Sequence, residues 1–170
     1  MNRYVKRMAL WAAAAFIFAA CASAPRFSDV TNRDWNLAEI RTKPENIIIE
    51  RNKLKEEGFG DIFTLRFDTE RVSGVGAPNR YFAPYTLADK QGITIKTAAQ
   101  TLMIAIREPE KLKEHDFFVY LQNVTKWNLT KENLELYSKR EDGAEAVLVF
   151  TPAIFPNPPA YRPENAPTDF

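Results

Sequence analysis

Apolar and polar residues alternate along much of the chain between residues 34 and 151. This two-residue period predicts antiparallel strands with one buried face. The run Phe-Thr-Leu-Arg-Phe-Asp at 63–68 shows the alternation most clearly. Other short strand patterns occur at 35–37, 47–49, 72–76, 81–85, 93–95, 134–136 and 147–150. An Asp-Gly turn between the last two predicts a hairpin, and two glycines in the run 71–76 predict a bend or a bulge.

One helical pattern interrupts the strands. Phe117, Tyr120, Leu121 and Val124 recur at the spacing of a single apolar helix face. Pro109 suits the first position of such a helix, which we expect to cover an opening in the sheet. The predicted fold class is α+β: a small antiparallel curled sheet or barrel of about seven or eight strands with one covering helix.

The body is rich in aromatic residues, and two interpretations of them stay open. They either fill the core or line an apolar cleft near the helix that binds a lipid chain or a segment of a partner. The residues concerned are Trp35, Phe63, Phe67, Tyr81, Phe82, Tyr85, Phe117, Tyr120 and Trp127.

The first twenty residues have the pattern of an export signal. Basic residues precede an apolar run at 9–20, and small residues then lead to Cys21, the single cysteine. Twelve apolar residues are too few for a spanning helix, which needs about 20. Phe18-Ala19-Ala20-Cys21 resembles the bacterial lipobox, with Phe where Leu is usual. The resemblance implies cleavage between Ala20 and Cys21 and acyl chains such as palmitate on Cys21. The alternative is an ordinary signal peptide cut elsewhere, such as after Ala24.

Removing residues 1–20 changes the charge balance. The remaining chain carries a net charge of about −2 and lacks the basic surface that nucleic-acid binding requires. With no second cysteine, the domain must be stable without disulfides. Export places it outside the cytosol in the cell envelope. Ala22 follows the lipidated position where an aspartate would favour inner-membrane retention, which favours the outer membrane.

The composition divides the chain into four parts. We predict a signal peptide at 1–20, a lipidated tether at 21–33, a globular domain at 34–151 and a proline-rich tail at 152–170. The tail holds six prolines, which exclude a helix or a central strand. It is either a loosely attached extension or a docking segment.

Motifs within the body are similar to those of the META domain, the HslJ-like family of bacterial envelope proteins. The run 72–81 resembles the family's Gly, Asn-Arg and aromatic signature, 101–105 its Thr-x-Met motif, and 114–121 its Glu-x-x-aromatic-x-x-x-Leu motif. The matching positions are Gly74, Asn79, Arg80, Tyr81, Thr101, Met103, Glu114, Phe117 and Leu121. The resemblance spans 34–151 and implies a small α+β barrel with no established enzymatic activity, on a lipoprotein or periplasmic protein linked to envelope integrity and stress tolerance. The family's paired cysteines are replaced by Pro78 and Ala105, so any thiol chemistry they supply elsewhere is missing here.

Catalytic, metal and cofactor sites are not expected. His115 is the single histidine and has no cysteine or histidine partner for a zinc site or a nucleophile–base pair. The Gly74-x-Gly76 pair lacks the third glycine and the Lys-Ser/Thr of a phosphate loop. Asn79-Arg80 suits a turn, with surface recognition by Arg80 as the alternative.

These observations predict a non-enzymatic, lipid-anchored envelope protein that binds another envelope component. Its expected partners are the membrane, through the lipid on Cys21, and an envelope protein or an apolar ligand, with no nucleic acid. Two alternatives stay open. One is a pilotin-like or chaperone lipoprotein with an apolar groove, and the other is an inhibitor that blocks an extracytoplasmic hydrolase with the loop at 78–81.

Overall fold

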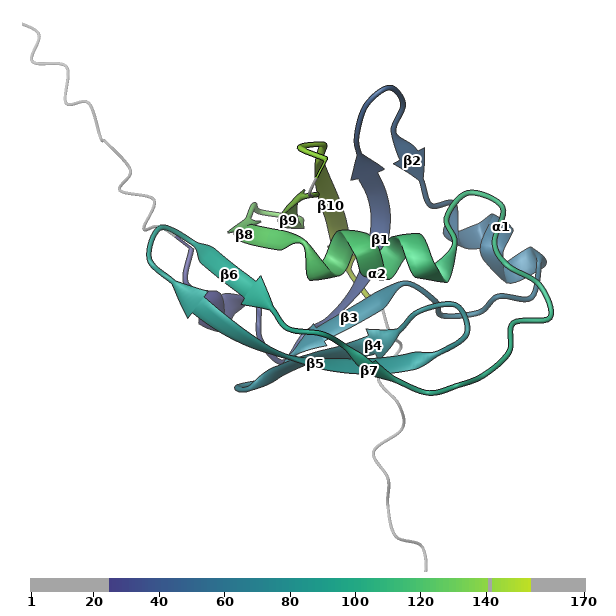
Figure 1. Cartoon of the computed structure of the whole chain (residues 1–170), viewed down its shortest axis with the longest axis horizontal. Coiled ribbons are helices and arrows are strands. Elements are labelled where there is room, and N and C mark those ends of the chain that lie inside the picture. The colour runs from purple at the N-terminus through teal and green to yellow at the C-terminus, as the bar shows by residue number, and fades with distance from the viewer. Residues whose placement is uncertain (1–24, 141, 154–170) are drawn as a thin grey trace, which may run out of the picture.

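A computed structural model describes residues 25–140 and 142–153. Its strands form one antiparallel sheet that closes on itself, because β1 pairs with both β3 and β10. Eight strands make the ring: β1 (Asp34–Arg41), β3 (Thr64–Phe67), β4 (Arg71–Val75), β5 (Arg80–Ala88), β6 (Gly92–Ile95), β8 (Val124–Leu129), β9 (Leu134–Lys139) and β10 (Glu145–Pro152). Two short strands lie outside the ring, β2 (Ile47–Ile48) beside β1 and β7 (Ala99–Gln100) beside β5. The predicted small antiparallel barrel is confirmed (Figure 1).

Alternation along the strands produces the core. In β3, Leu65 and Phe67 point inward and are buried, while Arg66 between them is exposed. The same pattern in β9 buries Leu134 and Leu136. Most of the aromatic residues lie inside: Trp35, Phe63, Phe67 and Phe117 are fully buried, and Tyr81 and Trp127 nearly so. Packing in the core therefore accounts for most of the aromatic content.

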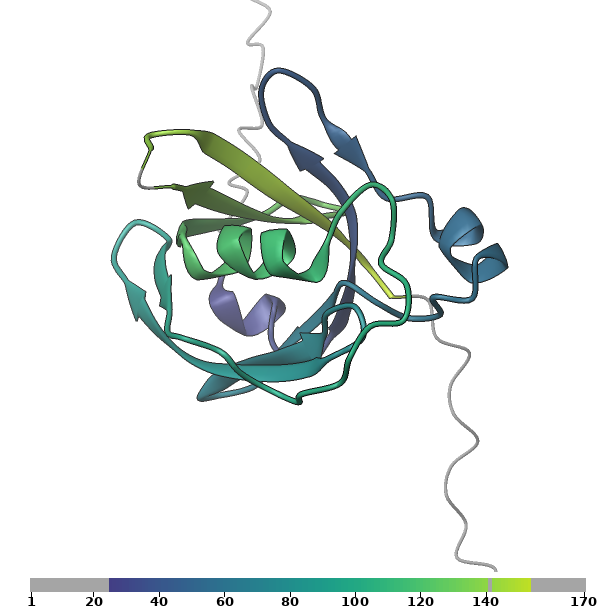
Figure 2. The same ribbon diagram turned by 45° about the vertical axis from the view of Figure 1, so that its right-hand side comes forward.

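Two elements close the ends of the barrel (Figure 2). At one end, the 3₁₀-helix η1 (Phe27–Asp29) places the Phe27 ring within 5.4 Å of the rings of Phe67, Tyr85 and Trp127. At the other end, the helix α2 (Glu114–Gln122) places the ring centroid of Phe117 5.2 Å from that of Phe63. The helix α2 lies in the region where a single covering helix was expected, but it is one of two α-helices among the described residues.

The number and start of the helices were predicted incorrectly. A second α-helix, α1 (Arg51–Glu56), buries only Leu54, so its six residues carry no apolar stripe. The helix α2 begins at Glu114, not near Pro109, and Val124 belongs to β8. Within residues 25–140 and 142–153, no helix has the length and apolar character needed to cross a bilayer.

Two other local expectations also change. The strands β4 and β5 pair in continuous register through Gly74 and Tyr81, so the predicted bulge is absent there. Val30 is fully buried and Phe27 packs on the core, so this end of the predicted tether belongs to the barrel. At the other end, Pro152 completes β10, while residues 154–170 of the predicted tail lie outside the described chain.

Packing of η1 on the barrel predicts a specific stability loss. Replacing Phe27 by Ala removes three ring contacts, and we expect it to lower the free energy of unfolding by about 2–4 kcal/mol. The neighbouring exposed Ser28→Ala is the matched control, with an expected change within about 0.5 kcal/mol. Urea denaturation of the two variants measures both. Equal, small losses would place η1 outside the cooperative fold.

Candidate functional site: a clamped apolar segment

The carboxylate of Glu114 holds the turn between β4 and β5. Its Oε1 accepts hydrogen bonds from the backbone N–H of Ala77 and of Asn79, the second at 2.7 Å. Its Oε2 accepts one from Asn79 Nδ2, also at 2.7 Å. Glu114 is the first residue of α2, where the helix dipole favours a negative charge. The turn and the helix are thereby joined by three charge-assisted bonds.

The side chain of Asn79 also forms hydrogen bonds with the segment that follows β7. Its Oδ1 accepts hydrogen bonds from Thr101 Oγ1 at 2.8 Å and from Met103 N at 2.7 Å. Its Nδ2 donates to Met103 O at 3.2 Å, in addition to Glu114. Asn79 is only 6% exposed, and both polar atoms of its side chain are satisfied. Asn79 therefore cross-links two loops.

Two glycines make room for this arrangement. A Cβ on Gly76 would collide with the Glu114 carboxylate and press on the Phe118 ring. A Cβ on Gly74 would collide with the backbone carbonyl of Thr64 on the neighbouring strand. The glycines in this signature therefore serve close approach between elements.

An aromatic contact supports the hydrogen-bond network of Glu114 and Asn79, which we call the clamp. The buried Tyr81 hydroxyl donates to Thr64 O at 2.9 Å, and burial raises the pKa of this phenol, so it stays protonated. The Tyr81 ring contacts Phe117 and Phe118 of α2, with centroids 6.0 and 5.3 Å away. Leu121 is fully buried on the same helix. The motif residues thus come together as a scaffold around Asn79 and Glu114.

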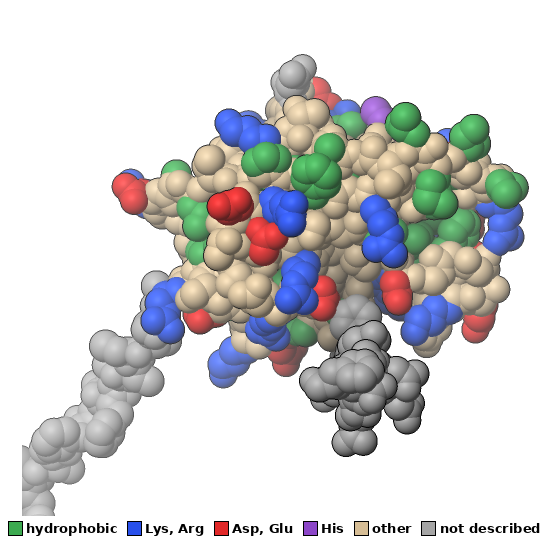
Figure 3. All heavy atoms as spheres, turned by 90° about the horizontal axis from the view of Figure 1, so that it is seen from below, with side chains coloured by type: hydrophobic (Ala, Val, Ile, Leu, Met, Phe, Trp, Pro, Cys, Tyr) green, Lys and Arg blue, Asp and Glu red, His purple; other side chains and the backbone are tan. Residues whose placement is uncertain are grey.

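The scaffold presents an unusually exposed apolar segment. Leu102, Ile104 and Ile106 are 93%, 92% and 99% exposed, and Met103 is 58% exposed. Arg107 ends the segment by stacking on Phe59, with 5.3 Å between its guanidinium and the ring centroid, and by donating to Glu57 O. Seen from below, apolar side chains gather on the side of the molecule that carries α1 (Figure 3). Large exposed apolar patches mark interaction sites in soluble domains.

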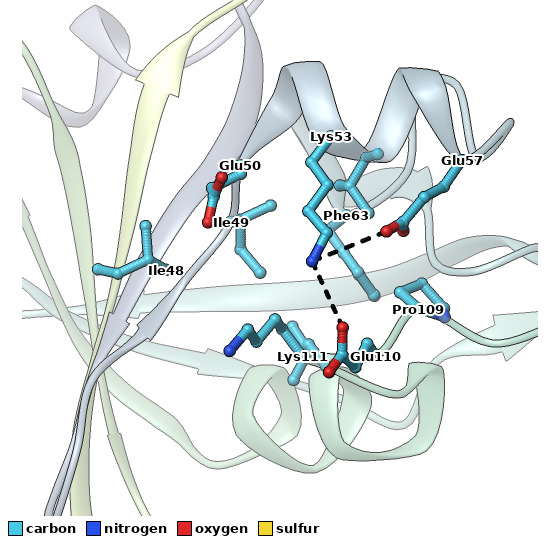
Figure 4. Close-up of a pocket in the computed structure, with 11 residues that line it drawn as sticks. Ile48, Ile49, Glu50, Lys53, Glu57, Phe63, Pro109, Glu110 and Lys111 are labelled. Atoms are coloured by element: carbon cyan, nitrogen blue, oxygen red, sulfur yellow. Dashed lines mark hydrogen bonds and ion pairs between the residues drawn. The ribbon is translucent and has the colours of Figure 1, made fainter.

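A small cleft lies between α1 and the residues that lead into α2 (Figure 4). It is lined mainly by Ile49, Leu54, Phe63, Pro109 and Leu112, and its free volume is about 20 Å³. That volume holds about one water molecule. It is too small for an acyl chain unless α1 moves away. Lys53 lies across the opening of the cleft, with its Nζ 3.4 Å from Glu110 Oε2 and 3.9 Å from Glu57 Oε1.

Of the remaining predicted residues, Arg80 meets this scaffold through its backbone, His115 is exposed on α2, and Cys21 lies outside the described chain. Arg80 begins β5 and is exposed; its backbone N–H donates to Thr101 Oγ1 at 3.2 Å. Among the described residues, no three His, Cys, Asp or Glu side chains are placed to hold a metal ion. Cys21 and the cleavage position lie in the part of the chain that is not described.

Sequence reasoning missed two features of the site. The exposure of Leu102, Ile104 and Ile106 had no sequence signal, because apolar residues are ordinarily assigned to a core. Arg51 was also missed. Its guanidinium donates to the carbonyls of Ile62, Leu37 and Phe63 and so fixes α1 to the barrel. Burial lowers the pKa of Arg51 to about 10, which leaves it a cation at neutral pH.

The clamp predicts that two substitutions in α2 lower the free energy of unfolding by different amounts. Glu114→Ala removes an acceptor of three hydrogen bonds and leaves donors in the turn unsatisfied, so we expect a loss of about 2–4 kcal/mol in unfolding free energy. Asp116→Ala, in the same helical turn but exposed, is the control and should change it by less than about 0.5 kcal/mol. Thermal or urea unfolding measures the difference. Similar losses for both variants would show that the carboxylate does not hold the turn.

Comparison with known proteins gives a family and a fold. No curated protein matches the chain. The solved NMR structure of a protein from Burkholderia xenovorans is similar over 91% of this chain and 100% of that chain, with 16% identity and a TM-score of 0.55. The crystal structure of a duf4847 family protein from Bacteroides vulgatus shares 12% identity over 74% of this chain and 95% of that one, with a TM-score of 0.48. The family model described as the META domain matches residues 28–153, and the chain therefore belongs to the META domain family.

Proposed function

We propose that this chain is a lipid-anchored, non-enzymatic binding protein of the cell envelope, and that the apolar segment 101–106 is its contact surface for another envelope component. The observation that carries the proposal is the exposure of Leu102, Ile104 and Ile106 on a backbone that Asn79 holds in place. Exposing such side chains to water costs about 1.5–3 kcal/mol each relative to burial. Burial of these side chains against a partner would recover that free energy.

The hydrogen bonds to Asn79 support a binding role more than a passive loop. They fix the backbone of Met103, so the neighbouring apolar side chains are presented from an ordered segment. A segment ordered before binding loses less conformational entropy when it meets its partner. The clamp thus favours the affinity of the segment for a partner, while it keeps apolar side chains exposed in the free protein.

The position of the N-terminal end is compatible with a tether. The described chain begins at Pro25 beside η1, at the end of the molecule's long axis opposite α1 (Figure 1). Three residues lie between Cys21 and Pro25, so the chain spans at most about 14 Å from one to the other. A lipid on Cys21 would hold the η1 end near the bilayer and direct the segment 101–106 away from it, toward protein partners.

The two alternatives have less support. A pilotin-like groove would have to form from the cleft beside α1, which is nearly filled. In the loop at 78–81 proposed as an inhibitor, Asn79 and Tyr81 are buried, so neither side chain is available to contact a hydrolase.

Anchoring is tested by changing the cysteine. We expect the natural chain to fractionate with membranes and to carry a diacylglyceryl group on Cys21. We expect Cys21→Ser to remain unmodified because serine has no thiol to form the thioether. Mass spectrometry of the purified protein and fractionation of cells measure both. An unmodified Cys21 in the natural chain would contradict the anchor.

Partner binding is tested with a photo-crosslinking residue placed at position 104 or, as control, at position 48. Ile48 is 50% exposed on β2 and lines the cleft beside α1, a different surface from the segment 101–106. We expect position 104 to give a defined crosslinked envelope partner in living cells and position 48 to give none. No crosslink from 104, or the same products from both positions, would contradict the proposed surface.

A further inference from the structure

The segment after β7 runs beside β5 and is not itself a strand of the sheet; it bends at Ile106 and Arg107, and its outer side pairs with no strand among the described residues. One side of it faces β5: Thr101 N donates to Arg80 O, and both backbone groups of Met103 bond to the Asn79 side chain. The backbone groups of Leu102 and Ile104 have no hydrogen-bond partner among the described residues. Figures 1 and 2 show the chain continuing past β7 along the rim of the barrel toward α1. An open, apolar edge of this kind is a template for another strand.

From this edge we infer that two copies of the chain pair antiparallel through the segment 101–106 and form a symmetric dimer. A two-fold axis requires each copy to present the same edge, and hence requires antiparallel pairing. The outward backbone groups belong to the even-numbered residues. A two-fold hydrogen-bonded pair can therefore form at Ile104, with Leu102 opposite Ile106 of the second copy.

The chemistry of the segment fits a copy of itself. Residues 97–106 carry no charge, so no like charges meet in this register. Leu102, Ile104 and Ile106 then lie side by side on one face and contact their counterparts across the pair. The bend of the chain at Ile106 and Arg107 limits the pairing to this stretch.

The available surface fits a weak dimer. Only four large apolar side chains, Leu102, Met103, Ile104 and Ile106, are exposed along the segment. A standard stable interface takes about 20–30 residues a side, so we expect weak, concentration-dependent self-association. Anchoring two copies to one membrane would raise their effective concentration and favour pairing. The dimer would cover the segment until an envelope partner displaced the second copy.

The experiment uses residues 21–170 with Cys21→Ser, because the closed barrel and η1 lie within this chain. Sedimentation velocity over the micromolar range should show a concentration-dependent dimer. Ile104→Lys, at a 92% exposed position, should weaken self-association roughly tenfold or more by burying a charge, without unfolding the barrel. Ile48→Lys is the matched control and should dimerise like the parent.

Single cysteines in the same background test the register. Hydrogen-bonded antiparallel neighbours have Cα atoms about 5.5 Å apart, within disulfide range. Ile104→Cys should therefore form a disulfide-linked dimer under mild oxidation, and Leu102→Cys, which faces Ile106, should not. A parent chain that stays monomeric, or equal crosslinking of both variants, overturns the inference. Neither measurement needs a lipid or an envelope partner, so its failure is distinguishable from failure of the proposed function.

Discussion

The structure of the site depends on one carboxylate and one amide. Glu114 binds the turn between β4 and β5, and Asn79 in that turn binds the segment after β7. Three parts of the chain, separated by up to 37 residues, are thereby fixed relative to one another. The barrel supplies the frame, since β4, β5 and α2 are each packed on the same core. Without this pair, the segment 101–106 would have fewer bonds that hold its backbone.

The same bonds explain why an apolar segment can remain exposed. A free loop of Leu, Met and Ile side chains would tend to collapse onto nearby apolar surface, because burial is favourable. Here Met103 is bonded on both its backbone groups, which holds the adjacent Leu102 and Ile104 outward. The exposed apolar side chains lower the stability of the free protein, but they form an ordered surface that a partner can bury. A dimer and an envelope partner are two ways to cover it.

Much of the barrel was predictable from local patterns. Alternation identified β1, β3, β4, β5, β6 and β9 through their buried faces. The strand β10 was identified by the Asp-Gly turn before it and by a continuous apolar run, and its residues 148–150 are all buried. The apolar stripe identified α2 through Phe117 and Leu121, although its start at Glu114 is set by contact with the turn. The helix α1 was not predictable, since one buried residue, Leu54, creates no period. Phe63, with a φ of 53°, is a left-handed position that sequence rules reserve for glycine or asparagine.

The site was predictable only as a set of positions. Family resemblance selected Asn79, Thr101, Met103 and Glu114, and the structure joins these four in one hydrogen-bond network. Their partners could not be derived from spacing, because barrel closure brings them together. The exposure of Ile104 and Ile106 is likewise a property of the tertiary structure. The META domain family membership fixes the fold and leaves the partner to experiment.

The most direct measurement of the central claim is amide hydrogen exchange at Met103. If the Asn79 clamp holds the segment, the Met103 N–H is protected in the dilute natural chain and loses protection in Glu114→Gln, while core amides such as that of Leu37 stay protected in both. A Met103 amide that exchanges at the rate of an unstructured peptide in the natural chain would contradict the account.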